Sequence, residues 1–138
     1  MCNKAEEIEV IVSSNCINIL AISETHLDDF LTDSDVNIEG FSIFRKVRNQ
    51  FGGGVAIYVQ NDFPAKVRYD LMRDDIEGLC VQVYLPHLKP ILICCFYRPP
   101  SADALSLYDL CDMFDKLSDM NNEIYLLGDL GTFYLSAF

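Results

Sequence analysis

The sequence predicts a layered α/β fold, on three observations. Residues 4–14 place Ile8, Ile11 and Val12 at i, i+3 and i+4 among charged neighbours, which is the spacing of one apolar helix face. The apolar run at residues 17–22 follows closely and is typical of a buried strand. Residues 104–117 repeat apolar side chains at helical spacing before a last apolar run at 123–127. A helix next to a buried strand at each end of the chain favours packed layers of both kinds.

Between these ends the chain carries several further strand patterns. Apolar or alternating runs predict strands near 41–47, 55–60, 66–71, 76–85 and 91–97, and the last strand near 123–128. The five-residue link at 86–90 predicts a hairpin between its two flanking strands. The 138 residues correspond to about one domain, and they contain no repeat, low-complexity segment or interdomain linker.

Composition limits the possible functions. The net charge of −11 gives no general attraction to phosphate, so action on nucleic acid requires a bound cation or another part of a larger protein. No apolar run is long enough to span a bilayer, and the polar N-terminal residues do not form a signal peptide. We therefore expect an intracellular protein, in the nucleus or the cytoplasm. Its cysteines form no C-x-x-C pair, and we expect all six to be reduced core residues: Cys2, Cys16, Cys80, Cys94, Cys95 and Cys111.

Polar residues that could carry chemistry follow three of the apolar strand patterns. Glu24 follows the 17–22 run, Tyr97 and Arg98 follow the 91–96 run, and Asp129 follows the 123–127 run. In layered α/β folds ligands bind beyond the carboxyl ends of strands, and carboxylates gathered there suit Mg²⁺. Each residue taken alone is more typical of a solvated loop.

Taken together, these segments resemble a known family. Residues 22–27 (I-S-E-T-H-L), 52–58 (G-G-G-V-A-I-Y), 96–100 (F-Y-R-P-P) and 126–129 (L-L-G-D) are similar to the serial motifs of the endonuclease/exonuclease/phosphatase superfamily. The likeness is greatest to the endonuclease domain of LINE-type (non-LTR) retrotransposon polyproteins, and it extends from about residue 4 to residue 129.

The resemblance implies a set of roles for this chain. Glu24 would hold the metal ion, Tyr97 would lie beside the scissile phosphate, and Asp129 would orient or deprotonate the attacking water. Arg98 would approach a phosphate or, equally, brace the end of its strand. The family cleaves DNA with Mg²⁺, and its complete fold is a four-layer α/β/β/α sandwich. We interpret the glycines before residue 55 as a turn and not as a phosphate cradle, and His26 as a loop residue.

The chain also departs from the family pattern. It begins in or near the helix that follows the family's first strand, so the Asn of that strand is absent, and Gly131 stands where the G-D-x-N motif has Asn. It stops before the family's later Asp and His residues. We therefore expect a partial domain at 1–130 with a divergent tail at 131–138, Mg²⁺ binding that is weak or absent, and little or no nuclease activity from the chain alone. A non-catalytic interaction protein derived from the same fold is the alternative, and a phosphatase acting on a small phosphate ester is a weaker one.

The arrangement of the layers follows from the strand order and the resemblance. We expect the strands in one mixed sheet, with helices near 4–15 and 103–119 on the same face. Because strands such as 17–22 and 91–96 are apolar on both faces, the other face would then be bare. A bare face predicts self-association, or pairing with a missing half of the domain.

Overall fold

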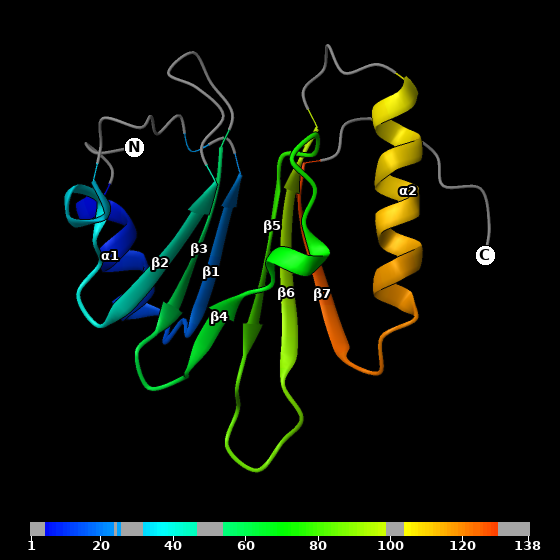
Figure 1. Ribbon diagram of the computed structural model, residues 1–138. Coiled ribbons are helices and arrows are strands. Elements are labelled where there is room, and N and C mark those ends of the chain that lie inside the picture. The colour runs from blue at the N-terminus through cyan, green and yellow to red at the C-terminus, as the bar shows by residue number, and fades with distance from the viewer. Residues whose placement is uncertain (1–4, 24, 26–31, 47–53, 99–103, 130–138) are drawn as a thin grey trace.

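Two β-sheets packed face to face, with one helix outside each, form the fold in the computed structural model (Figure 1). The structure describes residues 5–23, 25, 32–46, 54–98 and 104–129. The elements in chain order are α1 (Ala5–Ser14), β1 (Ile19–Ser23), the 3₁₀ turn η2 (Asp33–Val36), β2 (Phe41–Lys46), β3 (Val55–Gln60), β4 (Ala65–Val67), the 3₁₀ turn η3 (Tyr69–Leu71), β5 (Gly78–Val83), β6 (Ile91–Tyr97), α2 (Ala104–Ser118) and β7 (Glu123–Asp129).

The first sheet has three strands in the order β1-β3-β2, and both pairings are antiparallel. Its register joins Ser23 at the end of β1 to Val55 at the start of β3, and Lys46 at the end of β2 to the same Val55. The two strands that flank β3 therefore end where β3 begins.

The second sheet has four strands in the order β4-β5-β6-β7, and it is mixed. The β5–β6 pair is the antiparallel hairpin that the link at 86–90 predicts, and β7 returns parallel to β6 through α2. Parallel neighbours need such a crossover, because their connection must travel back along the sheet.

The inner faces of the two sheets form the main core. Val55, Ile57 and Val59 of β3 pack against alternate residues of β5 and β6, and Ile19 and Ala21 of β1 add to the cluster. The alternate residues of each strand face outwards, as the two-residue period of a strand requires. This is why these strands are apolar on both faces.

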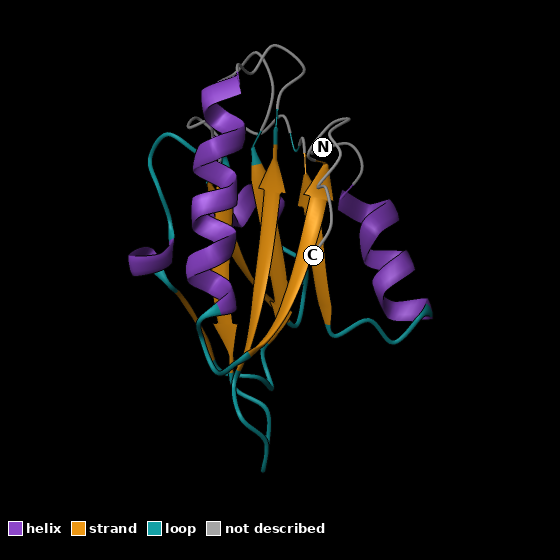
Figure 2. Ribbon diagram, turned by 90° about the vertical axis from the view of Figure 1, so that its right-hand side faces the viewer, coloured by secondary structure: helices purple, strands orange, loops and turns teal. Residues whose placement is uncertain are grey.

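The outer faces are covered by the helices, one on each side of the molecule (Figures 1 and 2). Leu110, Met113 and Leu117 of α2 pack on Leu92 and Cys94 of the second sheet. On the first sheet Ile8 of α1 packs against the cluster that contains Ala56 and Tyr58. The prediction of one sheet with both helices on one face was wrong, and so was the bare sheet face that followed from it. Each sheet is covered by a helix on one side and by the other sheet on the other.

Two local features differ from the expected pattern. The strand expected at 66–71 stops at Val67, and Tyr69–Leu71 form a 3₁₀ turn beside an ion pair between Arg68 and Asp70. In α1 the buried residue is Val12, and Ile11 is 53% exposed although the helical spacing places it on the apolar face.

The cysteines are more varied than expected. Cys80, Cys94 and Cys95 are free thiols within the core, as predicted, whereas Cys16 is exposed just after α1 and Cys111 is half-buried. Cys2 lies outside the described residues. The expectation that every cysteine is a core residue was therefore wrong for Cys16.

Candidate active site at the common edge of the sheets

One edge of the sandwich, at the top of Figure 1, collects the ends of strands from both sheets. Strands β1, β2, β6 and β7 end there, and β3 and β5 begin there. We call this the site edge. Every segment that the sequence marks as chemically interesting enters or leaves a strand at this edge.

Tyr97 and Asp129 lie side by side at the site edge. They are register partners in the parallel β6–β7 pair, and the backbone N–H of Arg98 donates a 2.8 Å hydrogen bond to the carbonyl of Asp129. Tyr97 is only 9% exposed and belongs to the core between the sheets. Asp129 is exposed, and Arg98 is half-buried. The structure thus brings the phenol of Tyr97, which is anchored in the core, the cationic residue Arg98 and the exposed residue Asp129 to the neighbouring ends of two strands.

The backbone conformation of Gly128 determines where Asp129 lies. Its φ is +123°, and a Cβ at this position would lie 1.9 Å from the carbonyl oxygen of Phe96 on the neighbouring strand. Only glycine permits both the conformation and the close approach of two backbones. The G-D pair of the sequence is therefore a structural unit, in which the glycine lets β7 pass close to Phe96 and the aspartate ends the strand.

Glu24, the expected metal ligand, lies outside the described residues, as do His26, Gly131 and the first two glycines of the triplet. The residues on either side of Glu24 are placed. Ser23 ends β1 at the site edge, and Thr25 is 3% exposed with its N–H bonded to the carbonyl of Gly54 at 3.2 Å.

Gly54 adopts φ +89°, and a Cβ there would lie 2.6 Å from Oγ1 of Thr25. This close packing agrees with the interpretation of the third glycine as a structural turn before β3.

Two residues at this edge were missed by the sequence reasoning. Thr25 follows Glu24 and is packed against Gly54, and Glu77 precedes β5 and accepts a hydrogen bond from the Gly54 N–H. The place of Glu77 directly before a strand pattern was the available signal in the sequence, but an acidic residue beside glycine is equally typical of a turn.

The described residues contain no group of three or more His, Cys, Asp or Glu side chains that could hold a metal ion. Mg²⁺ sites commonly use only one or two carboxylates and complete the shell with water and substrate phosphate. Asp129 is an exposed residue at the site edge, and a carboxylate is the kind of oxygen donor that such a site uses.

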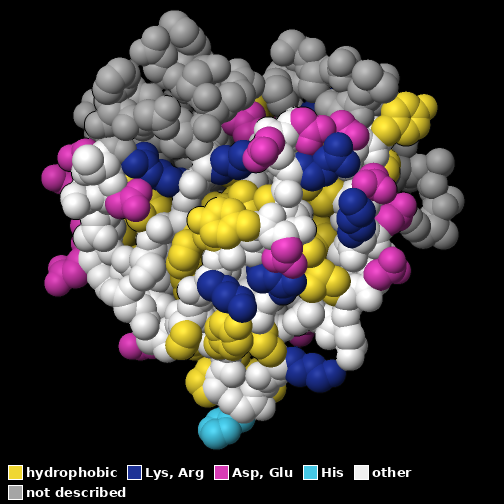
Figure 3. All heavy atoms as spheres, viewed as in Figure 1, with side chains coloured by type: hydrophobic (Ala, Val, Ile, Leu, Met, Phe, Trp, Pro, Cys, Tyr) yellow, Lys and Arg dark blue, Asp and Glu magenta, His cyan; other side chains and the backbone are white. Residues whose placement is uncertain are grey.

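Charges on the face of Figure 1 are of mixed sign, with Lys and Arg beside Asp and Glu (Figure 3). Arg73 contacts Asp75 at 3.0 Å and Asp109 at 3.2 Å, so its charge is largely balanced. Arg73 lowers the pKa of Asp75, and the hydrogen bond between Asp75 and Asp109 raises the pKa of Asp109. Among the residues that the structure describes, this face therefore offers no uninterrupted basic track for a nucleic-acid backbone.

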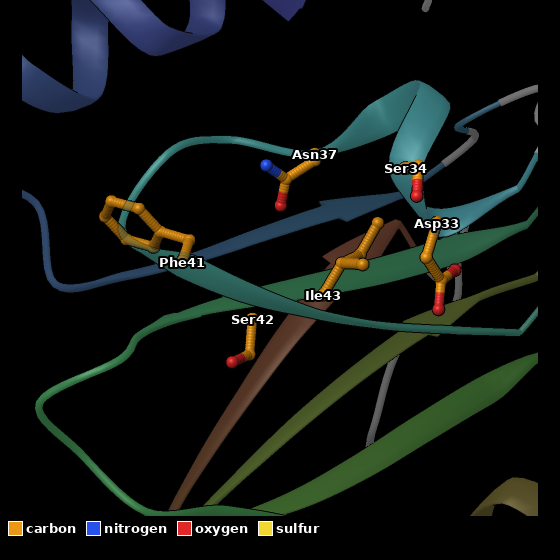
Figure 4. Close-up of a pocket in the computed structure, with 6 residues that line it drawn as sticks. All are labelled: Asp33, Ser34, Asn37, Phe41, Ser42 and Ile43. Carbon is orange, nitrogen blue, oxygen red and sulfur yellow. The ribbon is translucent and has the colours of Figure 1, made fainter.

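A separate open hollow of about 480 Å³ lies between η2 and β2 (Figure 4). It is lined by Asp33, Ser34, Asn37, Phe41, Ser42 and Ile43. None of these side chains is basic, and the carboxylate of Asp33 already pairs with Arg45 at 2.8 Å. The hollow lacks the positive charge that a phosphate ligand requires.

The fold is similar to that of the endonuclease domain of TRAS1, a telomere-specific non-LTR retrotransposon, with a TM-score of 0.66. The chain has the fold of a retrotransposon endonuclease domain. The match covers 90% of this chain and 51% of that chain at 13% sequence identity, so the chain spans about half the length of this structural relative.

The layered fold that the resemblance implied is thus confirmed. No protein-family model and no curated protein sequence matches the chain. In the described part of the chain, neither helix is long and apolar enough to cross a membrane.

Proposed function

We propose that the chain is part of a Mg²⁺-dependent endonuclease that hydrolyses phosphodiester bonds in DNA. The observation that carries the proposal is the pairing of Tyr97 with Asp129 at the site edge of an endonuclease-type fold. Phosphodiester hydrolysis requires a positioned water and stabilisation of negative charge on the phosphate. The backbone hydrogen bond between Arg98 and Asp129 holds a residue with a guanidinium next to a residue with a carboxylate, and both groups are of the right type.

Each residue has a distinct role in this proposal. The carboxylate of Asp129 is exposed, so it can accept a hydrogen bond from the attacking water and orient it. The ring of Tyr97 is fixed between the sheets, which gives a rigid wall beside the phosphate. Arg98 contributes positive charge for a phosphate oxygen, since a guanidinium recognises phosphate well.

The metal ion belongs to the same proposal. Glu24 would hold Mg²⁺, which supplies Lewis acidity towards the phosphate when it is bound, close to the water-orienting carboxylate of Asp129. Both residues adjoin strand ends at the site edge, since Ser23 ends β1 and Asp129 ends β7. Bound Mg²⁺ also offsets part of the repulsion between DNA and a chain with a net charge of −11.

We expect the 138-residue chain alone to turn over slowly. Gly131 carries no side-chain amide, so it cannot make the polar contact that the Asn of the G-D-x-N motif makes. Residues that act as a unit in catalysis lose most of their effect when one is removed. Mg²⁺ binding is correspondingly weak in this proposal.

The test is nicking of supercoiled plasmid DNA with the protein in excess, in Mg²⁺ and in EDTA. We expect slow Mg²⁺-dependent nicking that Asp129→Asn reduces by roughly 100-fold, the lower range for a positioned acid or base. Asp119→Asn is the matched control, because Asp119 is an exposed aspartate just after α2, and it should nick at the wild-type rate. Equal nicking by wild type and Asp129→Asn would refute the role of Asp129.

A second candidate function, non-catalytic pairing with another polypeptide, is favoured by β7. This strand is the last of its sheet among the described residues, and Tyr125, Leu126 and Leu127 are 44–48% exposed. Exposed apolar edge strands accept an additional strand from a partner.

Sedimentation over a range of protein concentrations tests this candidate. Association that Leu126→Lys abolishes, in EDTA as in Mg²⁺, supports pairing through β7. A monomer at every concentration excludes self-pairing of this strand.

A further inference from the structure

Glu77 connects the two sheets at the site edge. It precedes β5 of the second sheet, and one of its carboxylate oxygens accepts a hydrogen bond from the backbone N–H of Gly54, which precedes β3 of the first sheet. Its backbone carbonyl accepts a 2.9 Å hydrogen bond from the N–H of Tyr97. One residue thus touches the chain on the Gly54 side and the chain on the Tyr97 side.

These contacts are part of a continuous series of hydrogen bonds along the edge. Thr25 N–H donates to the carbonyl of Gly54 at 3.2 Å, and Arg98 N–H donates to the carbonyl of Asp129 at 2.8 Å. Between these two bonds, Gly54 is joined to Glu77 and Glu77 to Tyr97. The series begins at the residue after Glu24 and ends at Asp129, and the Glu77 carboxylate is its one side-chain member.

The Glu77 carboxylate lies where the two sheets meet, and most of the contact between the sheets is apolar. Their inner faces meet through apolar side chains such as Val55, Leu79 and Tyr97. At the site edge the ammonium group of Lys46, at the end of β2, also donates hydrogen bonds of 2.8 and 2.7 Å to the carbonyls of Arg73 and Ile76 before β5, so the Glu77 carboxylate is one of two charged groups that join the sheets there. Apolar contact is not directional, so by itself it specifies the angle between two sheets loosely. A hydrogen bond from an N–H to an ionised carboxylate is short, directional and stronger than one between neutral groups. Glu77 is also half-buried, which limits competition from water.

The position of Gly54 tightens this connection further. A Cβ on Gly54 would lie 2.6 Å from Oγ1 of Thr25 and 3.6 Å from the carbonyl oxygen of Lys46. Gly54 is therefore closely packed against Thr25 and the backbone of Lys46, in addition to its hydrogen bond to Glu77. If the Glu77 carboxylate moved, Gly54 would move with it, and the close packing of Gly54 would then displace Thr25.

We propose that Glu77 is a positioning residue, which fixes the Thr25 end of the first sheet relative to Tyr97 and Asp129 of the second. The effect of Glu77 on catalysis rests on the proposed function. An active site whose residues come from two sheets works only if the ends of those sheets keep a fixed distance and orientation. Glu77 acts through Gly54 and Tyr97 and does not itself contact the substrate. Its effect is on the geometry in which the reacting groups meet.

The experiment compares Glu77→Ala and Glu77→Gln with the wild type. Gln retains an oxygen that can accept the Gly54 N–H, whereas Ala removes the acceptor. Gln82→Ala is the matched control, since Gln82 is on β5, away from the site edge, and its side chain accepts a 2.6 Å hydrogen bond from Arg68. This control removes a side-chain hydrogen bond from the same strand without touching the edge.

The first measurement is NMR of the folded variants. Amide exchange at Gly54 should accelerate roughly tenfold or more in Glu77→Ala, the effect of losing one charge-assisted hydrogen bond. Residual dipolar couplings should show a changed orientation between the two sheets in Glu77→Ala, and the wild-type orientation in Glu77→Gln and Gln82→Ala. An unchanged orientation in Glu77→Ala overturns the proposal.

The second measurement is plasmid nicking in Mg²⁺. If the positioning role is correct, Glu77→Ala lowers kcat more than KM, Glu77→Gln restores most of the rate, and Gln82→Ala leaves it unchanged. If no protein nicks DNA, the proposed nuclease function fails, while the dipolar couplings still decide whether Glu77 positions the two sheet ends. If Glu77→Ala nicks at the wild-type rate, the positioning role is refuted even though the nuclease function stands.

Discussion

Replacing Gly128 by alanine tests the close approach of β7 to β6 at the site edge. The new Cβ would lie 1.9 Å from the carbonyl oxygen of Phe96 and 2.9 Å from its backbone nitrogen. These are main-chain atoms of a buried strand, so the strands must separate. The φ of +123° adds strain of its own for any L side chain, of order 1–3 kcal/mol.

Together the clash and the strain should lower the free energy of unfolding by at least about 3 kcal/mol, a large part of the 5–15 kcal/mol typical of a domain. For a chain of this length the corresponding fall in Tm is roughly 10 °C. Urea denaturation followed by circular dichroism measures the first quantity, and a thermal melt measures the second.

Gly40→Ala is the control for this substitution. Gly40 also has a positive φ, +83°, but a Cβ there meets nothing within 4 Å. It should cost only about 1 kcal/mol, the strain of the left-handed conformation alone. If the two variants lose the same stability, the steric contact between Gly128 and Phe96 does not exist as described.

Three further predictions concern thiols, pH and the turn before β3. Burial raises the pKa of Cys95 to about 11, so iodoacetamide at pH 8 should label exposed Cys16 readily and Cys95 only after unfolding. Arg73 lowers the pKa of Asp75, so this pair stabilises the fold above the unfolded pKa and loses its effect as pH falls through the folded pKa. Asp75→Asn should therefore flatten the decline of Tm in acid, by a small amount because the pair is exposed. Gly54→Ala should lower Tm and shift the amide resonance of Thr25, because its Cβ would clash with Oγ1.

Each of these predictions has a clear contrary result. Rapid labelling of Cys95 in the native protein, located by peptide mass spectrometry, would contradict its burial. An acid decline of Tm that is the same with and without Asp75 would show that its pair with Arg73 contributes nothing. An unshifted Thr25 resonance in Gly54→Ala would contradict the packing of these two residues.

Sequence periodicity located most elements but not their layers. The strand at 55–60 and the strand at 91–97 are apolar on both faces, and the structure uses both faces. A strand face can be covered by a helix or by a second sheet, and in both cases the side chains on that face are apolar. The pattern therefore predicts that a face is buried without specifying what buries it, which is how the single-sheet expectation arose.

The candidate site was predictable only where local sequence determines it. Tyr97 and Asp129 follow apolar strands, and the pairing of those strands brings the two residues together. Glu77 depends on Gly54, which belongs to the other sheet and is distant in the sequence. No local pattern encodes such a contact, since it exists only after the two sheets have packed.

The order of strands in the first sheet also has a consequence for folding. Its centre is β3, yet β1 is made before β2 and β3, and among the described residues it pairs with β3 alone. The β2–β3 and β5–β6 pairs join strands that are consecutive in the chain, so their loops close early, whereas β1 must wait for a distant partner. During synthesis β1 is therefore an apolar segment without its neighbour until residue 60 has left the ribosome. We expect the chain to be prone to aggregation during this interval, because an apolar strand is then exposed.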